Sequence, residues 1–113
     1  MPLLTLCTNT SIDKPETLAL NASKFVAELL SKPESYVMVK IESAQTLSFA
    51  GNCEPAAHLQ LKSLGLPQEK TTQFSLALCE FIESQLNINS ERIYIEFFNP
   101  ERTMWGWDKR TFA

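Results

Sequence analysis

Cysteine, histidine and long apolar runs are scarce in this sequence, and each scarcity excludes a class of protein. The three cysteines (Cys7, Cys53 and Cys79) are an odd number at wide spacing without a CxxC pair, which excludes a disulfide scaffold and favours reduced thiols in a cytosol. His58 is the only histidine and no metal-ligand spacing is present, so neither a zinc centre nor a Cys-His nucleophile is expected. We therefore expect chemistry without a metal or cofactor.

Apolar runs and basic clusters are too short to indicate a membrane or a nucleic acid as a partner. No apolar stretch approaches the ~20 residues that span a bilayer. The start of the chain lacks the basic and apolar regions of a secretory signal. Ten Lys and Arg residues are scattered among thirteen Asp and Glu, with a net charge of -3, so no basic stripe is present. We expect a cytoplasmic protein with no membrane or nucleic-acid partner.

The composition that remains is that of an ordinary globular protein. Of 113 residues, 44% are hydrophobic and 20% are charged, which predicts a single domain, residues 1–113, around one core. Leu3 to Thr8 is apolar and too short for a helix, so it predicts a buried strand. Alternating apolar residues predict another strand over Tyr36 to Glu42.

A helix is predicted between these two strands. Asp13 is the expected N-cap, followed by Pro15 in the first turn and by Glu16 in a capping-box position. Apolar residues recur at helical spacing from Leu18 to Leu30. Lys32-Pro33 ends the helix, because a residue before proline is disfavoured in the helical region.

The second half of the chain repeats the order strand, helix, strand. The predicted elements are a strand over His58 to Leu64, a helix from Phe74 to Leu86 and a strand over Arg92 to Phe98. An offset of 56 residues superimposes apolar positions of the two halves, among them Leu18 with Phe74, Phe25 with Phe81, Val26 with Ile82 and Val37 with Ile93. A true structural repeat and a chance match of two β-α-β units both explain this pattern. Either way, the sequence predicts an α+β fold in which two β-α-β units form a four-stranded mixed sheet with both helices on one face.

The other face of this sheet has no predicted cover. Short extra strands are predicted at Thr46 to Phe49 and Met104 to Trp107, but they are too small to hide it. Tyr36, Met38 and Phe98 would then meet water, at ~25 cal/mol per Å² of apolar surface. We therefore expect the chain to self-associate through this face and through the sheet edges.

Separated segments together carry a family resemblance. They are Met1-Pro2, Thr8-Asn9, Lys32-Pro33 with Tyr36, Phe49-Ala50-Gly51, Glu54-Pro55, Ser63-Leu64-Gly65, Arg92-Ile93-Tyr94-Ile95, Gly106-Trp107 and Thr111-Phe112-Ala113. In this order and spacing, the chain resembles the macrophage migration inhibitory factor family of the tautomerase superfamily. The resemblance implies a homotrimer whose three sheets wrap into a barrel, with an active site at each subunit interface. It also implies tautomerisation of small α-keto acids and aromatic enols such as phenylpyruvate and dopachrome-like compounds.

Such a reaction needs a base of near-neutral pKa and groups that hold the substrate and stabilise an enolate. Once Met1 is removed, Pro2 supplies a secondary amine, and burial in an apolar pocket lowers the pKa of such an amine. By resemblance, Lys32 binds the substrate carboxylate and lowers the pKa of the proline. Lys32 also suits a helix C-terminus as a cation that complements the dipole, and both roles are compatible.

The resemblance extends to the rest of the pocket. Leu64 stands where the family has an isoleucine whose backbone N–H contacts the substrate, and Tyr94 matches a tyrosine contributed by the neighbouring subunit. Tyr36, Trp107 and Phe112 match an aromatic rim, with packing in the core or the trimer as the alternative.

Three departures from animal members bear on function. Glu96 replaces an asparagine, which places an acid beside the amine if Glu96 faces the pocket as Tyr94 does; otherwise Glu96 faces solvent or pairs with a cation such as Arg92. Trp105 replaces a smaller apolar residue and narrows the pocket mouth. Ala56-Ala57-His58-Leu59 stands where those members have a CxxC dithiol, so thiol oxidoreductase activity is not expected.

Two functions are compatible with these residues. The first is an enzyme, a keto-enol tautomerase in which Pro2 is the catalytic base. The alternative is a cytokine-like interaction protein that keeps the fold with slight or incidental tautomerase activity, and the sequence leaves receptor binding open.

Overall fold

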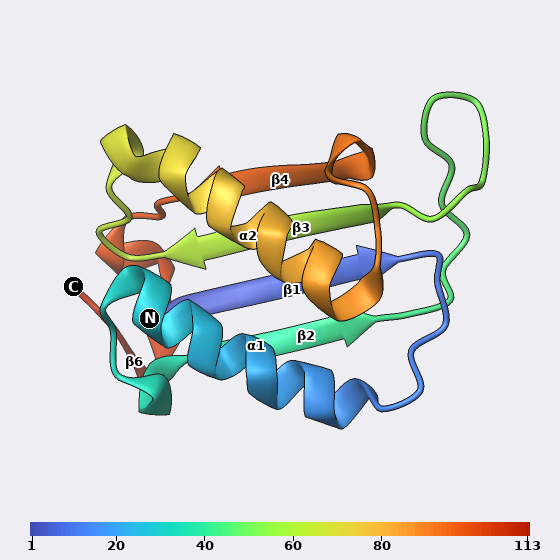
Figure 1. The fold of residues 1–113 in the computed structure, drawn as a ribbon. Helices are drawn as coiled ribbons and strands as arrows, with labels where there is room; N and C mark the ends of the chain where they lie inside the picture. Colours follow the sequence, from blue (N-terminus) through green and yellow to red (C-terminus); the bar gives the residue numbers. More distant parts are fainter.

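Four strands form one mixed sheet, and two helices cover one of its faces, in a computed structural model that describes residues 1–113 (Figure 1). The elements are β1 (Pro2–Thr8), α1 (Pro15–Leu30), β2 (Met38–Glu42), β3 (Ala57–Ser63), α2 (Thr71–Leu86) and β4 (Ile93–Phe98). The strand order is β2-β1-β3-β4; the central pair is antiparallel and both outer pairs are parallel. This arrangement confirms the predicted fold class. Neither helix is long and apolar enough to cross a membrane.

The repeat inferred from the sequence is present in the backbone. An offset of 56 residues maps α1 onto α2 residue for residue, and it maps the 3₁₀ turn η1 (Glu34–Tyr36) onto η3 (Ser90–Arg92). Both helices end on a left-handed residue, Ser31 and Asn87, at the same offset. Phe25 and Phe81, paired by the offset, stack with ring centroids 4.4 Å apart. These shared details favour a true structural repeat over a chance match.

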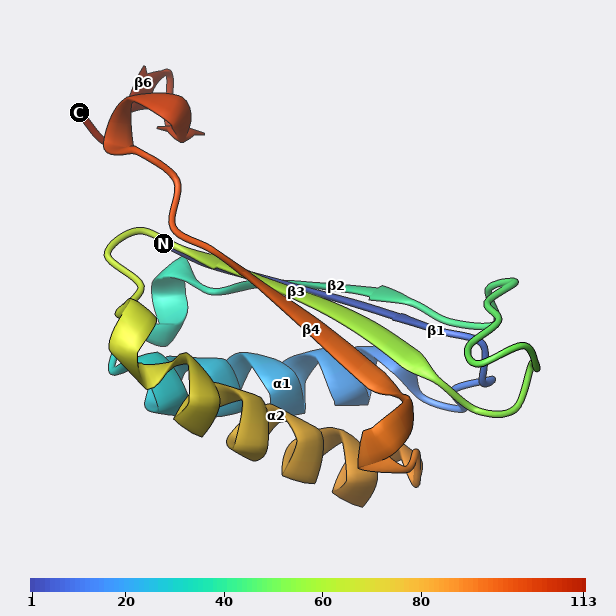
Figure 2. The same ribbon diagram turned by 90° about the horizontal axis from the view of Figure 1, so that it is seen from above.

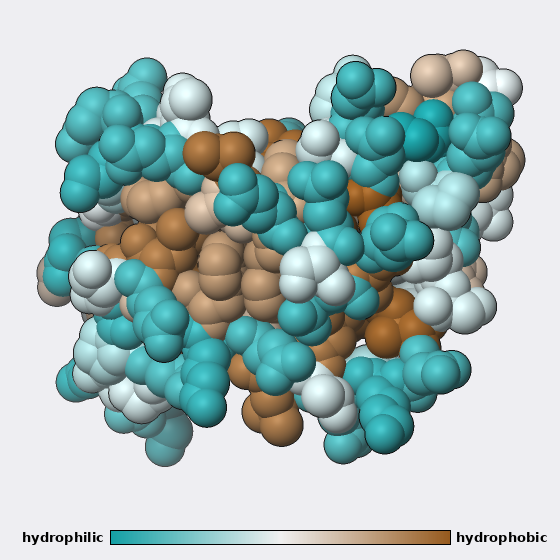
Figure 3. Space-filling model, viewed as in Figure 1, coloured by the Kyte–Doolittle hydropathy of each residue, from teal (hydrophilic) through white to brown (hydrophobic).

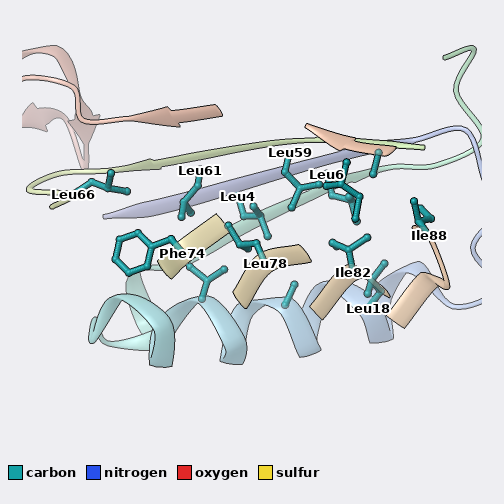
Figure 4. Close-up of a cluster of buried hydrophobic side chains, with 14 residues drawn as sticks. Leu4, Leu6, Leu18, Leu59, Leu61, Leu66, Phe74, Leu78, Ile82 and Ile88 are labelled. Carbon is teal, nitrogen blue, oxygen red and sulfur yellow. The ribbon is translucent and has the colours of Figure 1, made fainter. Parts of the chain in front are cut away.

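The core lies between the sheet and the helices (Figure 4). Alternate residues of the two central strands point into it, namely Leu4, Leu6, Leu59 and Leu61, and none is more than 1% exposed. Val26, Leu78 and Ile82 meet them from the helices and are fully buried. Burial of each such side chain contributes about 1.5–3 kcal/mol. On its outer side the helix layer shows patches of apolar surface among hydrophilic residues (Figure 3).

The ends of α1 differ from the prediction. Lys14, not Asp13, precedes the first helical residue, and no side chain caps this end, so the capping box with Glu16 is also wrong. Pro15 explains the difference, because a proline at the first position has no N–H to satisfy and its φ is already helical. At the other end, the Lys32 N–H donates to the Ala27 carbonyl (N to O 2.9 Å), which closes the helix beyond Ser31.

Three strand predictions need correction. Tyr36 lies in η1, and β2 begins only at Met38. The Tyr36 N–H donates to the Pro33 carbonyl (N to O 3.1 Å), so this residue belongs to a turn although the apolar alternation continues through it. Similarly, Arg92 ends η3 and β4 begins at Ile93. Thr46 to Phe49 forms no strand; Phe49 makes only an isolated bridge with Asn52.

Short strands do form near the C-terminus. β5 (Gly106–Trp107) pairs with β6 (Arg110–Thr111) after the 3₁₀ turn η4 (Arg102–Met104). Figure 2 shows this C-terminal segment standing away from the sheet on the side opposite the helices. It lies at the end of the sheet where the chain begins, so the two termini are near the same end (Figure 1).

The uncovered sheet face is more polar than the sequence suggested. Strand register arranges its side chains in three rows, which are Met38-Leu3-Lys62-Phe98, Lys40-Thr5-Gln60-Glu96 and Glu42-Cys7-His58-Tyr94. Apolar residues dominate only the first row, at the end where β1 begins. Met38 and Tyr94 are each 66% exposed. Self-association through this face would therefore bury one mainly apolar row, at the end where β1 begins, together with two mainly polar rows.

Candidate active site

Most of the predicted site residues come together at one end of the sheet. Pro2 is buried there and faces Ser63 across β1 and β3, and Leu64 follows with only 5% of its surface exposed. The C-terminal end of α1 lies at the same end (Figure 1) and brings Lys32 with it. This end therefore brings the start of the chain together with the Lys32 cation and with the buried residues Pro2 and Leu64.

A hollow of about 510 Å³ opens at this end between the sheet and the C-terminal segment. Four of the predicted residues line it: Pro2, Tyr36, Trp105 and Trp107. The remaining lining residues are Met1, Leu3, Ser35, Val37, Met38, Lys62, Pro100, Met104 and Gly106. Aromatic and aliphatic side chains thus form most of the wall, as in small-molecule sites.

The predicted aromatic rim is a single cluster. The Trp107 ring stacks on Phe112 with centroids 5.9 Å apart, and Tyr36 meets Trp107 edge-on at 6.3 Å. Three hydrogen bonds hold the Phe112 backbone in place. Its N–H donates to the carbonyls of Arg102 and Trp105, and its carbonyl accepts from Arg102 Nε at 2.9 Å. The C-terminal segment therefore presents Trp105 and Trp107 to the hollow, whereas Phe112 stacks on Trp107 and is not among the lining residues.

The amino terminus beside this hollow has a lowered pKa. Burial is the main cause that lowers the pKa of the Met1 amino group, and the positive charges of Lys32 and Arg102 lower that pKa further. All three causes disfavour the ammonium form. An amine at this end of the chain is accordingly a better base near neutral pH than an amino terminus in water.

Tyr94 and Glu96 lie on the sheet away from the hollow. Tyr94 belongs to the row with Cys7 and His58, about 16 Å along β1 from Pro2 at ~3.3 Å per residue. Both side chains point to the same open face, as the alternation predicted. Neither lines the hollow formed by Pro2 of the same chain.

Glu96 is paired, but with a partner that was not predicted. Its Oε1 lies 2.5 Å from His58 Nε2 and accepts a longer hydrogen bond from Gln60 at 3.4 Å. The hydrogen bond from His58 is the main cause that lowers the pKa of the Glu96 carboxyl. Arg92, the suggested cation, instead donates to the carbonyls of Phe49, Glu54 and Pro55.

Arg92 and Phe49 organise the surroundings of Tyr94. The Arg92 guanidinium lies 5.1 Å from the centroid of the Phe49 ring, and that ring packs edge-on against Tyr94 at 4.9 Å. Asn9 supports the same loop, because its side-chain nitrogen donates to the carbonyls of Leu47, Cys53 and Glu54. Tyr94 is therefore exposed but supported from one side.

Sequence reasoning missed Lys62 and Arg102. Lys62 lines the hollow because it faces Leu3 across β1 and β3. The alternation of β3 places Lys62 on the open face, but only the antiparallel register brings it beside the start of β1. Arg102 follows a loop that no periodicity describes.

Other potential sites are weaker. A second hollow, of about 490 Å³, lies between Thr10–Lys14, α1 and the end of α2, and it contains no predicted site residue. No group of three or more His, Cys, Asp or Glu side chains is arranged to hold a metal. Burial raises the pKa of the Cys7 and Cys79 thiols, with help from Glu42 and Glu83 respectively, which disfavours the reactive thiolates.

The repeated β-α-β units, the single mixed sheet and the pocket at the start of β1 are those of the tautomerase superfamily. The family model described as "Macrophage migration inhibitory factor (MIF)" matches residues 1–113, and the chain belongs to this family. It is 36% identical to a Xenopus tropicalis macrophage migration inhibitory factor, with both chains fully covered.

Solved structures agree with this assignment. The homologue from Prochlorococcus marinus superimposes with a TM-score of 0.92 at 34% identity, covering 98% of this chain and 99% of that one. The protein from Trichinella spiralis gives the same TM-score at 37% identity, covering 97% of this chain and 99% of that one. The fold is thus shared over nearly the whole length of each chain.

Proposed function

We propose that this protein is a keto-enol tautomerase that acts on small α-keto acids or aromatic enols, such as phenylpyruvate and dopachrome-like compounds. Pro2 is the catalytic base after removal of Met1. The observation that carries this proposal is the position of the amino terminus, which borders a largely apolar hollow where burial, Lys32 and Arg102 favour a neutral amine.

The reaction follows from the groups at this end. The Pro2 amine removes a proton from the carbon next to the substrate carbonyl. The electrons of that C–H bond form a carbon–carbon double bond, and the π electrons of the carbonyl move to its oxygen as the enolate forms. Proton return to the oxygen gives the enol, and the reverse sequence gives the ketone. Lys32 holds the substrate carboxylate, the Leu64 backbone N–H contacts the substrate, and Tyr36, Trp105, Trp107 and Phe112 surround its apolar part.

We further propose a homotrimer in which the neighbouring subunit completes each site. Support comes from the separation of Tyr94 and Glu96 from Pro2 along one open sheet face, because those two residues reach a pocket only if a second copy presents them. Three sheets wrapped into a barrel would also remove the exposed edges of β2 and β4. Light scattering is expected to give about three times 12.8 kDa; a stable monomer would contradict the shared site.

The decisive experiment measures tautomerisation of phenylpyruvate and dopachrome by protein whose N-terminus has been verified by mass spectrometry. A matched sample with an uncleaved N-terminal extension keeps the pocket but converts the Pro2 nitrogen to an amide. Activity is expected only in the sample with a free Pro2. Full activity in the extended sample would show that Pro2 is not the base. Inactivity of both samples, with the trimer intact, would favour the cytokine-like alternative.

A further inference from the structure

Lys62 is a cation without an acidic partner at the edge of the hollow. Its Nζ lies 5.2 Å from the centroid of the Phe98 ring, a contact that leaves the ammonium free to meet an anion. The only ion pair in the chain joins His58 and Glu96. Lys62 does lower the pKa of Glu96 through its charge, but the Glu96 carboxylate is bonded to His58 and Gln60 instead.

The whole hollow is biased toward negative ligands. Lys62 is the only charged side chain in its lining, and no Asp or Glu contributes to it. Lys32 and Arg102 add positive charge near the amino terminus. This bias is local, because the chain as a whole carries a net charge of -3.

The three cations differ in what they can offer a ligand. Lys32 has the role of binding the first carboxylate in the proposed reaction. Arg102 is tied to the C-terminal segment through its hydrogen bond to the Phe112 carbonyl. Lys62 has a flexible stem, and it projects from β3 beside Leu3, one register position from the pair formed by Pro2 and Ser63. Lys62 is therefore the cation with free hydrogen-bonding capacity on the sheet side of the hollow.

We infer that the preferred substrate of this site is an enolisable acid with two anionic groups, of which the second is bound by Lys62. This inference rests on the proposed tautomerase function. A monocarboxylate pairs with Lys32 alone and leaves Lys62 without a counter-ion from its own chain. A second anionic group pairs with Lys62 in a partly desolvated site, where a charge-assisted hydrogen bond is stronger than in water.

The first test compares oxaloacetate, a 2-oxo dicarboxylate, with phenylpyruvate, which has one carboxylate. Lys62→Met keeps the apolar stem and removes the charge. It is expected to raise KM for oxaloacetate by about tenfold or more, to change KM for phenylpyruvate by less than about twofold, and to leave kcat nearly constant. Lys62→Arg should restore most of the oxaloacetate KM. Lys24→Met, which removes one exposed charge from α1, is the matched control and should change neither value.

A merely structural role for Lys62 predicts a different result. In that case Lys62→Met would raise KM for both substrates equally, and Lys62→Arg would not selectively restore KM for oxaloacetate. Either outcome, or an oxaloacetate KM unchanged by Lys62→Met, would overturn the inference while leaving the tautomerase proposal intact.

A binding measurement separates this inference from the proposed function. Both tryptophans of the chain, Trp105 and Trp107, line the hollow, so intrinsic fluorescence reports its occupation. Succinate and butyrate are unreactive four-carbon acids that differ in one carboxylate. Succinate should bind about tenfold or more tightly than butyrate, and Lys62→Met should remove that difference. Equal affinities in the wild-type protein would refute the inference even if no tautomerase activity were found.

Discussion

The two β-α-β halves have the same backbone plan and different chemistry at equivalent positions. Lys32 and Ile88 each follow the left-handed residue that ends a helix, and the offset of 56 residues relates them. Ile88 is 1% exposed and belongs to the core, whereas Lys32 lies close enough to the amino terminus to lower its pKa. The repeat thus provides two similar helix ends, and only the one beside the start of the chain carries a cation.

The same contrast applies to the ends of the sheet. The end with Pro2 has the hollow, the aromatic cluster and unpaired cations. The opposite end has Tyr94, supported by Phe49 and Arg92. Each end holds part of the predicted site, so in the proposed trimer the two ends would complement one another across a subunit interface.

The largest expected effect comes from replacing Pro2, the proposed base, which has no counterpart in the second half. Pro2→Gly, with its N-terminus verified, should lower kcat/KM for phenylpyruvate by at least about a hundredfold, because a positioned general base contributes about 10²- to 10⁴-fold. Circular dichroism and thermal unfolding should change little, since Pro2 begins β1 and is absent from the core cluster. A variant that retained a tenth of the activity would exclude Pro2 as the base.

The next effect tests whether the halves are equivalent in the core. Val26 and Ile82 are related by the offset and both are 0% exposed. Ile82→Ala is expected to cost about 2–5 kcal/mol in the free energy of unfolding, and Val26→Ala should cost less because it deletes one fewer carbon. Urea unfolding at one fixed protein concentration measures both, so that the contribution of assembly is comparable between the variants. A larger loss from Val26→Ala would show that the two halves pack differently.

Replacing Lys32 by isoleucine, the residue at the equivalent position 88 of the second half, tests the role of the cation. Lys32→Ile should raise KM for phenylpyruvate by about tenfold, through loss of a charged hydrogen bond. It should also move the acidic limb of kcat/KM to higher pH. Lys32 lowers the pKa of the Met1 amino group and is expected to act in the same direction on the Pro2 amine, so its removal should raise that pKa, and only the neutral amine is a base. Lys24→Ile on exposed α1 surface is the control. An unmoved acidic limb would show that Lys32 does not lower the pKa of the catalytic amine.

The smallest effect concerns the far end of the sheet. The hydrogen bond from His58 lowers the pKa of the Glu96 carboxyl, which favours its ionised form. If a neighbouring copy presents it to the pocket, its charge raises the pKa of the amine and repels the substrate carboxylate. Glu96→Asn should then move the acidic limb downward by about half a unit, for a carboxylate ~6 Å away in water-like surroundings, and should lower KM. An unmoved limb with an unchanged KM would place Glu96 outside the site.

Hydrophobic periodicity was enough to predict the sheet, both helices and the repeat, because burial against one core imposes it. It could not locate the 3₁₀ turns before β2 and β4, since Tyr36 and Arg92 continue the strand pattern while their N–H groups bond within a turn. The N-terminal end of α1 was misplaced because Pro15 needs no side-chain cap.

Sequence reasoning grouped several residues that the structure places around the N-terminus in space. Pro2, Tyr36, Trp105 and Trp107 do line one hollow. The position of Lys62 depended on the antiparallel register of β1 and β3, and the partner of Glu96 depended on its pairing across β3 and β4. Both are contacts between distant segments, which local patterns do not specify.

The near-symmetry of the fold has a consequence for the order of its segments. The chain could be opened between Glu42 and Ala57 and its original ends joined by a linker, since both ends lie at the same end of the sheet (Figure 1), and every strand pairing would be kept. Such a circular permutant would place the nitrogen of Pro2 inside a peptide bond, where it is no longer basic. The architecture tolerates permutation, but the chemistry proposed for it allows only one choice of first residue.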